Sequence, residues 1–202
     1  MQNSDGSVEI AIEVEHKQGD NWLCVINEKL PKLYCDFPLL GTNDFAFPVV
    51  INCRSFNPTE PRNGIFLTTK EDKEDSDDVK ANKKYVLMAV NLYKKFLAYF
   101  IREQYKGIYN IVKINNQPAK DWISAEWIEE NVISELKEYI SKMPLVNSIN
   151  GEYCSLMDED GRDSLFMPTN QNEKARILLW KLVAKIYPNM LPKQEEFDEW
   201  YV

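Results

Sequence analysis

The stretch KLYCDFPLLGTNDFAFPVVINCRSFNPTEPRNGIFL, residues 32–67, decides the fold of the first third of the chain. Three prolines, Pro38, Pro48 and Pro58, fall inside or beside apolar runs, and Pro61 lies in the polar turn 58–64. Proline cannot donate to a strand ladder, and it pushes the residue before it into extended geometry. The stretch therefore predicts short strands near residues 32–36, 48–53 and 65–68, separated by breakers.

Upstream of this stretch the chain predicts a hairpin. Residues 8–15 alternate between apolar and mostly acidic side chains, which is typical of a half-buried strand. Residues 17–21 have turn chemistry, and residues 22–26 form the returning strand. Residues 1–70 are thus expected to form a β-rich subdomain.

An acidic segment follows. Residues 70–80 hold six acids and three lysines with one apolar residue, Val79. Such a run buries too little apolar surface to offset its ordering entropy, so residues 71–80 are predicted to form a mobile loop. Calcium is a second interpretation of these carboxylates, but the spaced acids, central glycine and closing glutamate of an EF-hand loop are missing.

The rest of the chain is rich in helical patterns. Apolar residues recur at helical spacing over 81–105, 124–142 and 171–187, and a short helix is expected at 193–200. A strand is expected at 108–114 and a hairpin at 145–156, centred on Asn150-Gly151. Residues 81–202 are therefore expected to form a helix-rich α+β subdomain, or one continuous domain with the first part. The predicted class is α+β, with a mixed, mainly antiparallel sheet and long helices packed on one side.

Composition limits the partners. The net charge is −8, which argues against nucleic acid, because phosphate binding needs a basic face. No apolar run approaches the length of a membrane span, and the polar N-terminus is no signal peptide, so no membrane partner is expected. The four cysteines form no CxxC pair and are interpreted as reduced, buried thiols. A cytoplasmic location is expected.

Catalytic motifs are sparse. The sequence has neither GxxxxGK[ST] nor GxGxxG, and its single histidine, His16, is better explained as an exposed strand-end residue than as a general base. The acidic stretch 158–163 is favoured as a hairpin tip over a metal site. We expect no metal and no enzymatic activity in this chain, although a small hydrolase with an unrecognised site is the remaining enzymatic hypothesis.

The amino-acid sequences of three segments resemble a known family. Residues 37–41 (FPLLG), 47–52 (FPVVIN) and 57–65 (NPTEPRNGI) resemble the region after the nucleotide-binding module in sacsin-like proteins, which are related to heat-shock chaperones and histidine-kinase-like ATPases. The family's asparagine-bearing helix and Asp-x-Gly-x-Gly turn do not occur here. The resemblance therefore implies a non-catalytic fragment with no cofactor of its own, whose parent protein holds ATP and Mg²⁺. It would couple the neighbouring ATPase module of the same chain to a client or partner protein.

The resemblance directs attention to one loop, the coupling loop, made of Asn57, Pro58, Thr59, Glu60, Pro61, Arg62, Asn63 and Gly64. In this superfamily a basic side chain from the following domain commonly reaches the γ-phosphate, which makes Arg62 the first candidate and Arg54 the second. The simpler interpretation is a turn arginine paired with Glu60 or a backbone carbonyl.

A free-standing protein-interaction module without an ATPase link is the alternative function. A fragment predicts an exposed apolar patch near its first strand or its C-terminus, whereas a self-contained module predicts none. Three tryptophans are candidate contact positions, although core packing is the favoured role for each: Trp122, Trp127 and Trp200.

Overall fold

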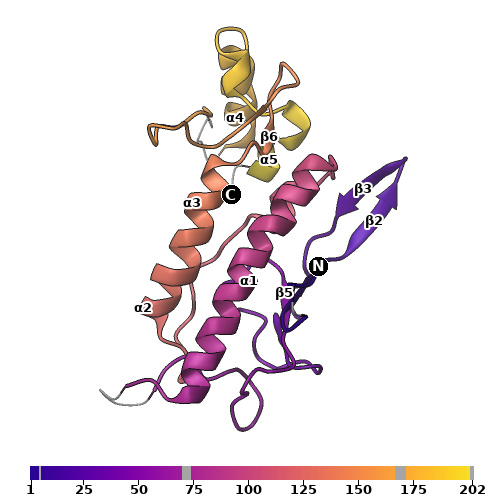
Figure 1. Cartoon of the computed structure of the whole chain (residues 1–202). Helices are drawn as coiled ribbons and strands as arrows, with labels where there is room; N and C mark the ends of the chain where they lie inside the picture. Colours follow the sequence, from indigo (N-terminus) through magenta and orange to yellow (C-terminus); the bar gives the residue numbers. More distant parts are fainter. Residues whose placement is uncertain (5, 70–73, 167–171, 201–202) are drawn as a thin grey trace. The chain divides into compact units, whose positions relative to one another are not determined.

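The computed structural model describes residues 1–4, 6–69, 74–166 and 172–200 (Figure 1). The chain divides into two compact units, Met1–Lys137 and Glu138–Val202. The predicted division fell at residues 71–80 instead. The units divide later because the long helix after that segment packs on the first strand and so shares a core with residues 1–69.

A small mixed sheet forms the base of the first unit. Its strands are β1 (Glu9–Ala11), β5 (Val50–Asn52) and β4 (Leu33–Tyr34), in that order. β1 pairs antiparallel with β5, and β4 pairs parallel with it. The strands expected near 32–36 and 48–53 are confirmed in shortened form. The strand expected at 65–68 is wrong, because Ile65 makes only a single bridge to Pro58.

The predicted N-terminal hairpin is present but separate from this sheet. It consists of β2 (Val14–Lys17) and β3 (Asp20–Leu23), which pair antiparallel. Gln18 and Gly19 form its turn with positive φ angles of 54° and 90°. The strand expected at 8–15 divides into β1 and β2, so Ile10 is buried while Val14 is 42% exposed.

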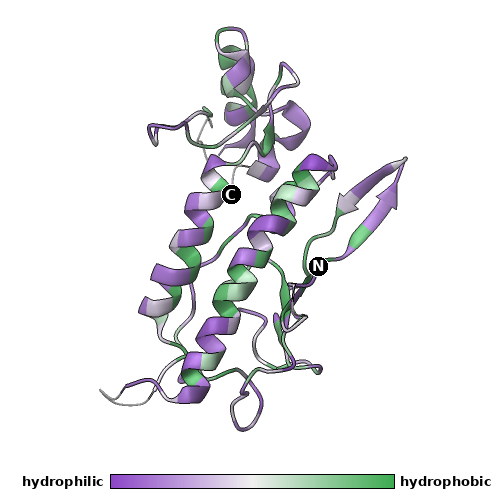
Figure 2. Ribbon diagram, viewed as in Figure 1, coloured by the Kyte–Doolittle hydropathy of each residue, from purple (hydrophilic) through white to green (hydrophobic). Residues whose placement is uncertain are grey.

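The central element of the first unit is helix α1 (Asp77–Arg102). It begins inside the segment predicted as a loop, because Ser76 accepts a hydrogen bond from the Val79 N–H and the acids of the first turn suit the helix dipole. The loop expected at 71–80 is therefore wrong for 77–80, while 71–73 lie outside the described residues. α1 packs against β1 on one side and against the helical residues 129–133 on another. Figure 2 shows its green, apolar turns interleaved with purple ones.

Tertiary contacts also convert a predicted strand into a helical turn. Residues expected as a strand at 108–114 contain a 3₁₀ turn, η1 (Ile108–Ile111). The buried Tyr93 hydroxyl donates to the Ile111 carbonyl at 2.6 Å, and the Asn110 side chain donates to the Leu23 carbonyl at 2.9 Å. These bonds fix the segment beneath α1 and beside β3 in place of a strand ladder.

The helix expected at 124–142 is confirmed with an irregular middle. It comprises α2 (Ala125–Ile128), a π-helical turn η2 (Glu129–Ile133) and α3 (Ser134–Lys142). Ser124 caps it as expected, accepting from the Trp127 N–H at 3.2 Å. Figure 1 shows α1 between α2 and the strand β5, so these helices lie on one side of the sheet.

The second unit contains the rest of α3 and a hairpin of β6 (Val146–Asn147) and β7 (Tyr153–Cys154). Its turn holds Gly151 at φ 83°, as the Asn-Gly signal predicted. Helix α4 (Glu173–Val183), the 3₁₀ turns η3 (Pro188–Met190) and η4 (Gln194–Glu196), and α5 (Phe197–Trp200) complete the described part. The α+β class is thus confirmed, with three small sheets among the described residues in place of the single mixed sheet that was expected.

Candidate functional site: the coupling loop

The coupling loop is closed by its own hydrogen bonds. The Thr59 N–H donates to the Gly64 carbonyl at 2.9 Å, and the Thr59 hydroxyl donates to the Asn63 side chain at 2.7 Å. The Arg62 N–H donates to the Thr59 carbonyl at 2.5 Å, and Pro58 and Ile65 form an isolated antiparallel β-bridge. Thr59 is buried, so one threonine organises the whole turn from inside.

Asn82 of α1 holds both flanks of the loop. Its side-chain oxygen accepts from the Asn57 N–H at 2.8 Å, and its amide donates to the carbonyls of Asn57 at 2.9 Å and Phe66 at 3.0 Å. Asn82 is fully buried. A side-chain amide with three satisfied bonds in a buried place acts as a fixed clamp, because each unmade bond would leave a desolvated polar group. The loop is therefore attached rigidly to the central helix.

The C-terminal end of the coupling loop, at Gly64, packs against the aromatic side chain of Trp122. A Cβ placed on Gly64 would lie 2.1 Å from the indole of Trp122. Trp122 stacks on Phe45, with ring centroids 6.4 Å apart and planes 25° apart, and its carbonyl accepts from the Leu67 N–H at 2.8 Å. Only glycine allows this approach, so Trp122 is a packing residue and not a surface contact.

Arg62 is presented at the loop surface. It has a positive φ of 70°, its side chain is exposed, and its guanidinium carbon lies 4.9 Å from the ring centre of Phe37. Among the described residues no salt bridge to Arg62 is found, from Glu60 or from any other acid. The arginine stacks on an aromatic face, which orients a cation without neutralising it.

Arg54 has a different environment. Its Nε lies 2.6 Å from a carboxylate oxygen of Asp36, so its charge is already paired. The Asp36 N–H in turn donates to the Asn52 side chain at 3.0 Å. The structure thus separates the two candidates: Arg54 belongs to a surface ion pair, whereas Arg62 keeps its charge available.

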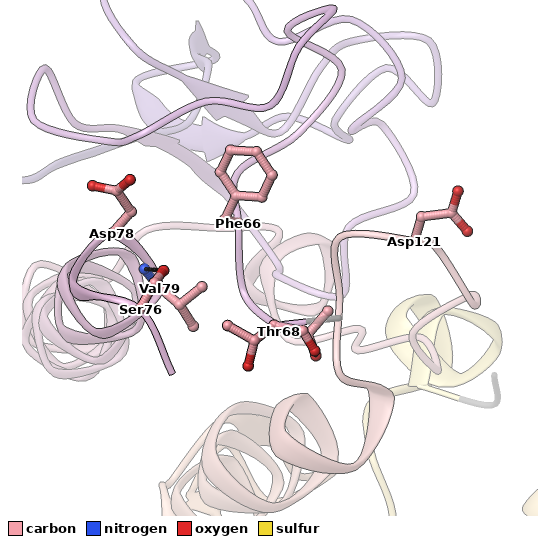
Figure 3. Close-up of a pocket in the computed structure, with 7 residues that line it drawn as sticks. Phe66, Thr68, Ser76, Asp78, Val79 and Asp121 are labelled. Carbon is pink, nitrogen blue, oxygen red and sulfur yellow. Dashed lines mark hydrogen bonds between the residues drawn. The ribbon is translucent and has the colours of Figure 1, made fainter. Parts of the chain in front are cut away.

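One pocket of about 280 Å³ lies beside the N-terminus of α1 (Figure 3). Its lining combines two carboxylates, three hydroxyls and two apolar side chains: Asp78, Asp121, Thr68, Thr69, Ser76, Phe66 and Val79. No basic side chain is among these lining residues. A phosphate group would meet two like charges there, so the pocket does not suit a phosphorylated ligand.

The cysteines and the single histidine are the other side chains with reactive groups. Burial raises the pKa of the Cys53 thiol to about 11 and also raises the pKa of Cys35 and Cys154. A raised pKa disfavours the thiolate and hence nucleophilic chemistry. His16 faces the Asn21 side chain at 3.2 Å in the exposed β2–β3 hairpin. Within residues 1–4, 6–69, 74–166 and 172–200, no cluster of metal ligands is found.

The remaining predicted contacts are packing or surface contacts. The Trp127 ring lies 5.2 Å from the Lys83 ammonium, and the Trp200 indole donates to Glu196 at 3.2 Å.

In the described part of the chain no helix is both long and apolar enough to cross a membrane. A fragment was expected to expose an apolar patch near its first strand or its C-terminus, but the patch was not assigned to a helix. The structure exposes an apolar face on α4, where leucine at 178 and 182 and isoleucine at 186 form one row of the helix surface.

Comparison with protein-family models, curated proteins and solved structures finds no match for this chain. The resemblance to sacsin-like proteins therefore rests on the three quoted segments alone.

Proposed function

We propose that this chain is a non-catalytic coupling module of a chaperone-like ATP-binding protein. The observation that supports this is the presentation of Arg62, which is an exposed arginine without a carboxylate partner among the described residues, on a clamped loop. Asn82 fixes the two flanks of that loop, and Thr59 closes the turn from inside. A preset cation on a rigid support suits the stabilisation of developing negative charge, because it needs no reorganisation when the charge appears.

The role assigned to Arg62 is that of an arginine finger. In phosphoryl transfer, charge spreads over the oxygens of the transferred group, and an arginine supplied from outside the nucleotide pocket stabilises it. The nucleotide and its Mg²⁺ belong to a neighbouring module of the same parent protein in this proposal. This chain contributes the guanidinium, and the Phe37 ring holds its orientation.

The alternative is a free-standing protein-interaction module with no ATPase link. The exposed apolar face of α4 supports the coupling fragment, for which a patch near the C-terminus is expected, over the self-contained module, which predicts none. The four free thiols support a cytoplasmic location for both.

The test is ATP turnover by the full-length parent protein, with nucleotide affinity measured in parallel. Arg62→Ala should lower turnover about tenfold or more at unchanged affinity, which corresponds to roughly 1.4 kcal/mol of transition-state stabilisation. Arg54→Ala is the matched control and should change neither quantity, because Arg54 is paired with Asp36. A parent protein that binds no ATP, or equal turnover for both variants and wild type, would remove the coupling role and leave the interaction module.

A further inference from the structure

Helix α4 exposes a continuous row of large apolar side chains. Leu178, Leu182 and Ile186 follow one another at intervals of four residues, the last in the turn after the helix. They are 66%, 59% and 62% exposed. Side chains four apart lie one above the other on a helix, so the three form a single ridge. Leu179 and Tyr187, 38% and 56% exposed, widen the ridge on one side.

The opposite face of α4 is attached to its own unit. The Trp180 indole donates to the Pro192 carbonyl at 3.0 Å, and Arg176 makes a salt bridge to Asp198 at 3.2 Å. Asn172 caps the helix by accepting from the N–H groups of Lys174 and Ala175. These contacts fix the rotation of α4 about its axis, so the apolar ridge is held outward.

The ridge is bordered by positive charge. Lys174 continues its row, and Lys181 and Lys185 form the neighbouring row; all three are exposed. Among the described residues none of the three makes a salt bridge. Residues 173–187 carry four basic and one acidic side chain, a net charge of +3, in a chain whose net charge is −8. The surface is therefore apolar and locally basic.

We infer that α4 docks an acidic amphipathic helix of a partner protein. A ridge of residues four apart packs into the groove of a second helix, and glutamates beside that groove would meet the lysines. Two copies of α4 would instead bring two surfaces of charge +3 together, which opposes self-association. An anionic lipid surface is much wider than one helix and would also meet acidic parts of this chain of net charge −8, whereas a single acidic helix would meet mainly the basic surface of α4. The inference is independent of Arg62 and of any nucleotide.

The first experiment measures the binding of a fluorescent peptide to the whole chain by anisotropy. The peptide is a helix former of about 20 residues with leucine along one face and glutamate on both borders of that face. A second peptide carries lysine in place of each glutamate. We expect saturable binding of the glutamate peptide that weakens as salt is added, and at least tenfold weaker binding of the lysine peptide.

Variants locate the contact. Leu178→Ser/Leu182→Ser and, separately, Lys181→Glu/Lys185→Glu should each weaken binding of the glutamate peptide at least tenfold. Leu40→Ser removes a leucine of similar exposure, 69%, from the other unit and should leave binding unchanged. All substituted side chains are exposed, and circular dichroism verifies that each variant is folded.

The results that would contradict the inference lead to different conclusions about the apolar ridge. No saturable binding, equal binding of both peptides, or unchanged binding by the leucine variant would overturn the inference. Light scattering that shows a wild-type dimer, and a monomer for the leucine variant, would assign the ridge to a second copy. Co-sedimentation with vesicles of phosphatidylserine and phosphatidylcholine, without peptide binding, would assign it to a lipid surface.

Discussion

The contact between Gly64 and Trp122 gives a sharp test of the coupling loop. In Gly64→Ala the new Cβ would lie 2.1, 2.4 and 2.6 Å from three atoms of the indole. Since ordinary contact begins near 3.4 Å, the ring or the loop must move by about 1 Å. The ring has little freedom, because Trp122 is 6% exposed and stacked on Phe45. Overpacking of this kind costs about 1–3 kcal/mol, and we expect the upper part of that range.

A double-mutant cycle separates this collision from other effects of alanine. Trp122→Leu removes the ring, and its own cost comes from the lost burial and the cavity that remains. In that background Gly64→Ala should cost less than about 0.5 kcal/mol, which gives a coupling energy of about 2 kcal/mol. Urea titrations of the four proteins, followed by circular dichroism, provide the free energies. An equal cost of Gly64→Ala in both backgrounds would refute the steric argument.

Two further predictions concern stability. Asn82→Ala should lower the free energy of unfolding by about 2 kcal/mol in urea titration, because it removes the partner of the part-buried Asn57 N–H and of the Phe66 carbonyl. The control is Asn91→Ala, whose exposed amide donates only to the Leu87 carbonyl, and a loss equal to that of the control would contradict the clamp. Burial raises the pKa of Cys53 from 9.0 to about 11, so the folded state favours the thiol. The stabilisation is fully present below pH 9 and is lost as the pH rises through 11, by about 3 kcal/mol in total. Titrations between pH 8 and 11.5 should show this slope in wild type and a shallower one in Cys53→Ala; parallel curves would exclude Cys53 as the cause.

Local signals in the sequence predicted the ends and turns of several elements correctly. Ser124 caps its helix, and Asn150-Gly151 forms the hairpin turn, because each of these residues acts on backbone groups within a few positions. The prolines of residues 32–67 correctly indicated short, interrupted strands. The charged composition of residues 77–80 predicted a loop, and this was wrong, because the cap at Ser76 begins a helix there despite the run of charges.

The candidate site was only partly predictable. The breakers around Arg62 indicated an ordered loop, but its clamp, Asn82, lies in a segment whose pattern predicted a buried helix and no role for one asparagine. The partner of Arg62 could not be predicted either, since Phe37 lies 25 positions earlier. The α4 ridge had a visible pattern, but an apolar row at helical spacing predicts burial, and the structure leaves it exposed.

The sequence by itself determined the α+β class, the helices and the tight turns, because their signals act between residues a few positions apart. The tertiary structure alone decided which faces became buried, which of two arginines kept its charge free, and where a predicted strand became a turn. Those outcomes depend on pairs such as Tyr93 with Ile111 and Arg54 with Asp36, whose members are distant in sequence. The periodicity of apolar residues in the sequence does not show which distant residues will meet, because only folding brings them together.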